Sequence, residues 1–139
     1  MALEVAGTLR YDFADGVFLI DLAPLQDASQ VAEQVARSLG VAAVVERPAA
    51  EMLREFVRNK QMLLLLDNFE HVLGAAELVS DLLAHAGRLK ILVTSREPLH
   101  VRGEHEFPVP PLELPDPAAF PPLEALARYS AVALFVERA

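Results

Sequence analysis

Two short apolar runs, each closed by polar residues, constrain what this chain folds into more than any other feature. The first is Met62–Leu66, followed by Asp67, and the second ends at Val93, followed by Thr94 and Arg96. Continuous apolar runs of this length are typical of parallel strands that are buried on both faces. In open α/β sheets, ligands bind outside the carboxyl ends of such strands. Asp67 and Arg96 are therefore predicted to meet at one sheet edge, as a metal-side carboxylate and a phosphate-side cation.

The pattern around these runs predicts helices between the strands. Asp27 or Ser29 caps the first of these helices, and Gly40 ends it. Strands that alternate with helical patterns predict βαβ units and a parallel sheet, so the expected fold class is α/β. The expected strands are 16–22, 62–66 and 89–94, and the expected helices are 27–39, 49–60 and 70–86.

The two ends of the chain differ from this middle part. Residues 2–9 have the pattern of a helix that lacks a capping residue at its start, and 104–109 suit a short fourth strand. Prolines then crowd the chain, which predicts a stiff, extended connector and, after it, a last helix over 123–138. The expected organisation is an α/β domain over 1–110, a Pro-rich connector over 111–122 and the start of a helical domain over 123–139.

Composition narrows the function classes. The 139 residues include 53% hydrophobic side chains, which argues against disorder, and no cysteine, which excludes disulfides and thiol catalysis. A net charge of −8 provides neither the basic face that direct nucleic-acid binding needs nor a polybasic patch for a membrane surface. Every apolar run is shorter than the ~18 residues that span a bilayer, and the first residues do not form a secretory signal. We therefore expect a cytoplasmic protein.

The strand that ends at Asp67 has the general form of a Walker B strand. A carboxylate at that point can hold Mg²⁺ beside the phosphates of a nucleotide. Asn68 lies beside it, and Glu70 or His71 is placed to orient an attacking water. The structural alternatives are that Asp67 caps the following helix and that Glu70 occupies the positive end of that helix.

The residues after the third strand have the form of a phosphate sensor. The hydroxyl groups of Thr94 and Ser95 and the guanidinium of Arg96 suit contacts to a terminal phosphate. The alternative is a turn in which Arg96 pairs with Glu97 in solvent.

Other polar residues support no separate site. Asp21 also ends a strand, but a structural role is the favoured interpretation. The spacing of His85, His100 and His105 matches no standard zinc motif. A phosphate-cradling G-x-x-x-x-G-K-[S/T] loop is missing from the sequence, which has two lysines, and neither follows a glycine.

Four stretches together resemble a known family. They are DNFEH (67–71), ILVTSREPL (91–99), FPVPPLELPDP (107–117) and RYSAVALFVERA (128–139). In order and spacing they resemble the NB-ARC-like ATPase domain of STAND proteins, specifically the ATPase domains within large bacterial transcriptional regulators. The resemblance covers about 2–139, nearly the whole chain.

This resemblance implies a three-layer P-loop NTPase core that lacks its first strand, with the chain starting just after the Walker A motif. It makes Asp67 the Walker B acid on Mg²⁺ and Arg96 the sensor arginine, with Thr94 and Ser95 beside it. Asn68 stands where many relatives have a second acid, which leaves the catalytic base open, and Glu70 is the substitute candidate.

The resemblance also implies a function. Such domains are ATP/ADP- and Mg²⁺-dependent switches whose partners are other domains of the same regulator. Residues 1–110 would then be a partial nucleotide-binding domain, and 123–139 would begin the following helical domain. Without the first strand, two strand edges lack partners. We therefore expect the isolated chain to bind ATP·Mg²⁺ very weakly or not at all, to hydrolyse no ATP, and to self-associate or lose order at its amino end.

Two other function classes stay open. One is a non-catalytic protein-interaction module that uses the acidic surface and the Pro-rich connector. The other is a receiver-like phosphoacceptor domain with Asp67 as the acceptor, but Asp21 has no acidic neighbour and no lysine follows Lys90. A hydrolase built on Asp21, Asp67 and a histidine is not supported, because the sequence has no nucleophile-elbow motif.

Overall fold

A computed structural model describes residues 4, 7–116, 118 and 121–138. The described residues form two compact units, one up to Glu104 and one from His105 onward. Each unit is considered by itself.

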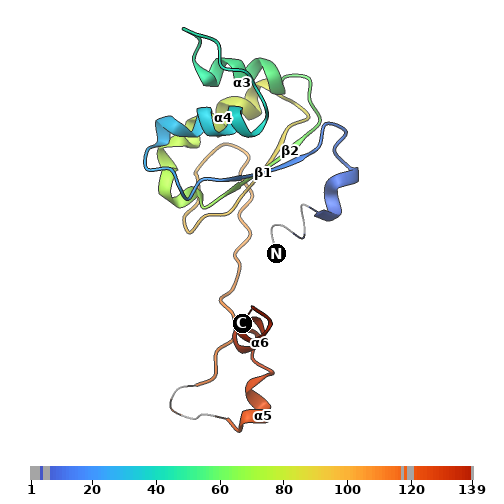
Figure 1. The fold of residues 1–139 in the computed structure, drawn as a ribbon, viewed down its shortest axis with the longest axis vertical. Helices are drawn as coiled ribbons and strands as arrows, with labels where there is room; N and C mark the ends of the chain where they lie inside the picture. The colour runs from blue at the N-terminus through green and yellow to red at the C-terminus, as the bar shows by residue number, and fades with distance from the viewer. Residues whose placement is uncertain (1–3, 5–6, 117, 119–120, 139) are drawn as a thin grey trace. The chain divides into compact units, whose positions relative to one another are not determined.

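The first unit contains a three-stranded parallel sheet, which confirms the α/β class (Figure 1). Its strands are β1 (Val17–Asp21), β2 (Leu63–Asp67) and β3 (Lys90–Val93), in the order β1-β2-β3. The four leucines of the central strand β2 are all buried, as the continuous apolar run predicts.

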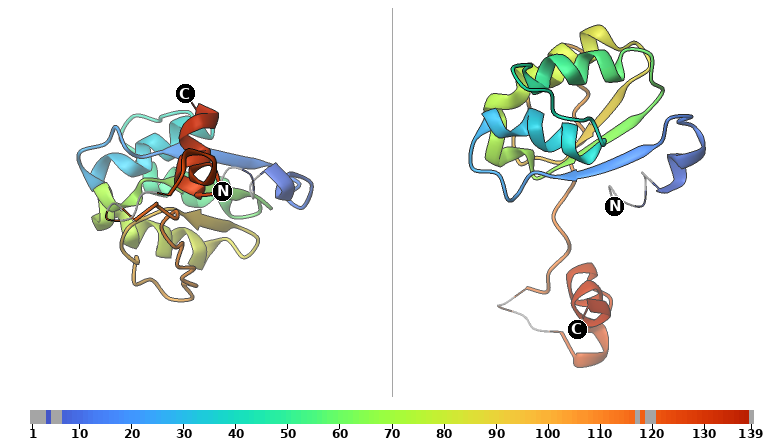
Figure 2. Two further views of the ribbon diagram at one scale, coloured as in Figure 1. Left: turned by 90° about the horizontal axis from the view of Figure 1, so that it is seen from below. Right: turned by 45° about the horizontal axis from the view of Figure 1, so that its top comes forward.

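The helices that follow β1 in the first unit lie on one side of the sheet (Figure 2). Asp27 accepts a hydrogen bond from the Ser29 amide, 2.8 Å away, and so caps the first helical segment as predicted. Gly40 follows that segment with φ +70°, a left-handed backbone that suits a helix stop. The segments are η2 (Ala28–Gln30), α2 (Val31–Ser38), α3 (Ala49–Val57), η3 (Phe69–Ala75) and α4 (Ala76–His85).

The main core lies between the sheet and these helices. Ile20, Leu64 and Leu66 belong to it together with the buried faces of α2, α3 and α4. Because side chains alternate along a strand, Leu65 points to the opposite side of the sheet, where it is also buried. Its neighbour in β1, Leu19, is on the same side and is 49% exposed. Only the central strand therefore has two buried faces.

The predicted continuous helix over 70–86 is wrong. Residues Phe69–Ala75 form a 3₁₀ segment in which Val72 departs from helical geometry (φ −135°, ψ 36°), and α4 begins at Ala76. The Phe69 amide donates to the Thr94 carbonyl oxygen, 3.0 Å away, so the first turn is tied to the end of β3. Phe69 and Val72 are both buried, and the kink brings both side chains into the core.

The predicted fourth strand over 104–109 is also wrong, since none of these residues lies in a strand. Pro108 and Pro110 have no N–H to donate to a neighbouring strand. The expected helix over 2–9 falls partly outside the described residues. Glu4, Gly7 and Thr8 are helical, and η1 (Leu9–Tyr11) follows them.

In the second unit, the predicted single helix over 123–138 is two helices, α5 (Leu123–Leu126) and α6 (Ser130–Arg138). The Glu113 amide donates to the Ser130 hydroxyl at 2.9 Å. The first residue of α6 is therefore hydrogen-bonded to the Pro-rich segment that contains Glu113. The described parts of the chain contain no helix long and apolar enough to cross a membrane.

Candidate functional site

Three polar residues form a row across the carboxyl end of the sheet. Asp21 and Asp67 are register partners at the ends of β1 and β2. Thr94 lies one residue beyond the Leu66↔Val93 pair, and its amide donates to the Leu66 carbonyl at 3.0 Å. Because side chains alternate along strands, the three residues of the row face the same side of the sheet, opposite the side that carries Ile20, Leu66 and the helices.

The Thr94 hydroxyl joins two of these strands. Its oxygen accepts a hydrogen bond from the Asn68 amide at 3.0 Å and donates its own proton to the Asp67 carboxylate. Asp67 and Thr94 are therefore in direct contact at one edge of the sheet.

Asn68 connects the third strand of the row, β1, to Asp67 and Thr94. Its backbone is left-handed (φ 62°, ψ 43°), and its side-chain Nδ2 donates to Oδ1 of Asp21 at 3.1 Å. The same Asp21 oxygen accepts the Ala23 amide at 2.9 Å. The Ala23 amide and then the Asn68 side chain hold the pKa of Asp21 below its usual value, since both stabilise the charged carboxylate. The Asn68 side chain, predicted to contact a cofactor, thus has a protein partner.

Arg96 and Glu70 form an ion pair at the same edge, with 3.6 Å between Nε and Oε1. The Arg96 side chain is 88% exposed, whereas that of Glu70 is 18% exposed. The partner of Arg96 is therefore Glu70 and not Glu97, the partner in the alternative turn. The Glu97 amide instead donates to the Ser95 hydroxyl at 3.2 Å.

The residue types at this edge suit a hard cation beside an oxyanion. Carboxylate and hydroxyl oxygens are ligands of the kind Mg²⁺ takes, and an exposed guanidinium binds phosphate oxygens. The described residues contain no group of three His, Cys, Asp or Glu side chains placed to hold a metal. A cation at Asp67 would thus complete its coordination with water and ligand oxygens, as Mg²⁺ commonly does.

Sequence reasoning missed the part that Asp21 takes in this network. The position of Asp21 in the sequence could have indicated this role, because Asp21 ends an apolar strand in the same way as Asp67 does. His71 is exposed, and His85 lies 3.4 Å from the carboxylate of Asp81 one helical turn earlier.

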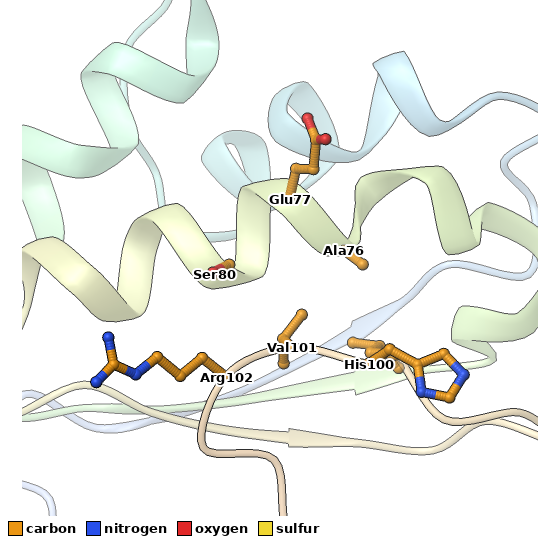
Figure 3. A pocket seen from close by; sticks show the side chains of 7 residues that line it. Ala76, Glu77, Ser80, His100, Val101 and Arg102 are labelled. Carbon is orange, nitrogen blue, oxygen red and sulfur yellow. The ribbon is translucent and has the colours of Figure 1, made fainter.

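A small pocket lies elsewhere, between α4 and the loop that follows β3 (Figure 3). Val101 points from the loop toward the helix between Ala76 and Ser80, while His100 and Arg102 point away from each other along the loop. The volume of about 250 Å³ is below the range of most small-molecule sites.

The fold and the polar row define an α/β protein whose parallel sheet gathers polar side chains at its carboxyl edge. No protein-family model and no solved structure matches the chain. The chain is 39% identical over 119 residues to proteins of Mycobacterium tuberculosis and Mycobacterium bovis named "Putative HTH-type transcriptional regulator". This alignment covers 85% of the chain but 13% of each relative.

A second Mycobacterium tuberculosis protein, named "Uncharacterized protein", is 31% identical over 140 aligned positions. That alignment covers the whole of this chain and 32% of the relative. The chain thus spans a third or less of the curated relatives named here.

Proposed function

We propose that this chain is part of a STAND-type nucleotide switch within a bacterial transcriptional regulator. The observation that carries the proposal is the contact between Asp67 and Thr94 at the carboxyl edge of a parallel sheet, with the exposed Arg96 two residues further on. Sheet edges of this kind are where open α/β folds bind their ligands.

The proposed roles follow from the chemistry of each side chain. Asp67 holds Mg²⁺, directly or through water, and Thr94 orients its carboxylate. Arg96 breaks its ion pair with Glu70 and binds the terminal phosphate instead, because a guanidinium matches phosphate oxygens in a bidentate arrangement. Glu70, released from that pair, becomes free to orient water. Exchange of the Arg96 partner would thus couple the nucleotide state to η3, the segment that precedes α4.

The 39%-identical relatives support the regulatory part of this proposal, since each is named "Putative HTH-type transcriptional regulator". The net charge of −8 argues that DNA contacts belong to another region of such a protein. In that arrangement the partners of this chain are other domains of the same regulator.

Calorimetric titration of Mg²⁺·ATP and Mg²⁺·ADP tests the proposal. The titration is run on the 139-residue chain and on an extended form that also carries the sequence encoded upstream in its gene. We expect binding by the extended form only, lost in Asp67→Asn and weakened in Arg96→Ala. Arg58→Ala is the control, since Arg58 is an exposed arginine outside the site. Absence of binding by the extended form contradicts the proposal.

A second candidate function is a protein-interaction module, which the second unit favours. Large apolar side chains there are exposed, among them Phe107 at 80% and Phe135 at 73%. Contiguous exposed apolar patches mark surfaces that other protein domains cover, and side chains such as these would form one. Absence of nucleotide binding by both forms, together with a loss of self-association in Phe135→Ser, would favour this function.

A further inference from the structure

We propose that Asp21 is a positioning residue of the nucleotide site, and that it acts through Asn68 on Asp67 and Thr94. The inference rests on the proposed function, which it deepens by adding a residue from β1. Asp21 itself is not placed against the ligand.

The first step is the continuity of the hydrogen bonds. The Asp21 carboxylate accepts the Asn68 side chain at 3.1 Å, and the Asn68 amide donates to the Thr94 hydroxyl at 3.0 Å. That hydroxyl donates to the Asp67 carboxylate. One chain of hydrogen bonds therefore runs from the end of β1 through the ends of β2 and β3 back to the proposed Mg²⁺ ligand.

The second step concerns the backbone of Asn68. A left-handed conformation is unfavourable for residues with a Cβ, although asparagine tolerates it better than most. In this conformation the amide of Asn68 reaches Thr94 while its side chain reaches Asp21. Because the two contacts come from one residue, removal of the Asp21 acceptor frees the side chain and loosens the turn that directs the amide.

The third step is the match of donor to acceptor. Asp21 is held in its charged form by the Ala23 amide, so it accepts but does not donate. An amide at position 68 supplies the donor that this carboxylate needs. A carboxylate at position 68 would face Asp21 across about the same 3.1 Å and repel it. Asn68 is thus the complement of Asp21.

An exchange of the two side chains tests this inference. Asn68→Asp places two carboxylates together, and we expect it to weaken Mg²⁺·ADP binding by the extended form about tenfold or more. Asp21 Oδ1 accepts both the Ala23 amide and the Asn68 side chain. In the double variant Asp21→Asn/Asn68→Asp, the side-chain oxygen at position 21 keeps the Ala23 amide, and Nδ2, in place of the second carboxylate oxygen, turns to donate to the new carboxylate. We expect the double variant to recover affinity to within about threefold of the wild type.

The control is Asp27→Asn, because Asp27 is another carboxylate with a pKa lowered by a backbone amide, at the start of η2 and outside the site. It should leave the affinity unchanged. Failure of the double variant to recover, with Asn68→Asp still folded by circular dichroism, overturns the inference.

A second readout separates this inference from the proposed function. In the 139-residue chain, NMR resonances of the Thr94 and Asp67 backbone amides are compared between the wild type, Asp21→Ala and Asp27→Ala. A shift in Asp21→Ala alone supports the positioning role even if no form binds nucleotide, in which case only the proposed function fails. Unchanged resonances overturn the positioning role, whatever the result of the nucleotide titration.

Discussion

The hydroxyl of Thr94 donates a hydrogen bond to the carboxylate of Asp67 across two neighbouring parallel strands. The same oxygen accepts the amide of Asn68 at 3.0 Å, so one small side chain satisfies two polar groups on the adjacent strand. Thr94 therefore holds the end of β2 to the end of β3 at the point where the backbone leaves the sheet.

Replacement of Thr94 should destabilise the first unit. In Thr94→Val the shape is kept but the hydroxyl is lost, which leaves the half-buried Asn68 amide without its acceptor. We expect a loss of about 1–3 kcal/mol in the free energy of unfolding. Urea denaturation followed by circular dichroism measures it. Thr94→Ser retains the hydroxyl and is the matched control, and an equal loss in both variants would contradict the assigned role.

The two faces of the sheet should respond differently to truncation of a leucine. Leu64 is fully buried in the main core, and Leu64→Ala should cost about 2–5 kcal/mol. Leu19 is 49% exposed on the other face of β1, so Leu19→Ala should cost less than about 1 kcal/mol. Urea denaturation of both variants measures these two costs as shifts of the unfolding midpoint relative to the wild type. Equal costs would mean that Leu19 is covered in solution.

The loop after β3 should be sensitive to acid through Glu104. Its carboxylate accepts the amides of Leu99 at 2.8 Å and Val101 at 3.2 Å, and the Leu99 amide is the main cause of a pKa below the ordinary 4.5. Because folding lowers the pKa of Glu104, its carboxylate stabilises the folded state above about pH 4.5. This contribution to stability is lost as the pH falls through the pKa that Glu104 has in the folded state.

Glu104→Gln tests that dependence. Near neutral pH we expect the variant to be about 1 kcal/mol less stable than the wild type, since the neutral amide forms weaker hydrogen bonds. The difference should shrink as pH falls below about 4.5, because the wild type then loses its charge. Glu106→Gln, an exposed glutamate two residues away, is the control. A difference that stays constant with pH would rule out the carboxylate as its source.

Position 68 should favour glycine over alanine. Both substitutions remove the side-chain bond to Asp21, but only glycine adopts the left-handed backbone without a steric cost. Asn68→Gly should therefore be about 1 kcal/mol more stable than Asn68→Ala by thermal unfolding. The opposite order would show that the backbone at this position is not left-handed in solution.

Local pattern was sufficient for part of the fold. The unbroken leucine run of β2 predicted a strand buried on both faces, and Asp27 and Gly40 marked the limits of the first helical segment. Pattern failed where a distant strand competes with local propensity. Helical periodicity over 70–86 did not reveal that the Phe69 amide bonds to the Thr94 carbonyl, which replaces the first helical turn with a 3₁₀ segment.

The sequence by itself determined which residues end the strands and so which polar groups meet at the sheet edge. The position and length of a strand depend on local hydrophobic pattern, which the sequence displays directly. Only the tertiary structure decided their partners: Thr94 for Asp67, Asn68 for Asp21 and Glu70 for Arg96. Hydrogen bonds and ion pairs depend on register and backbone angles to within a fraction of an ångström, and these arise only when the strands pack side by side.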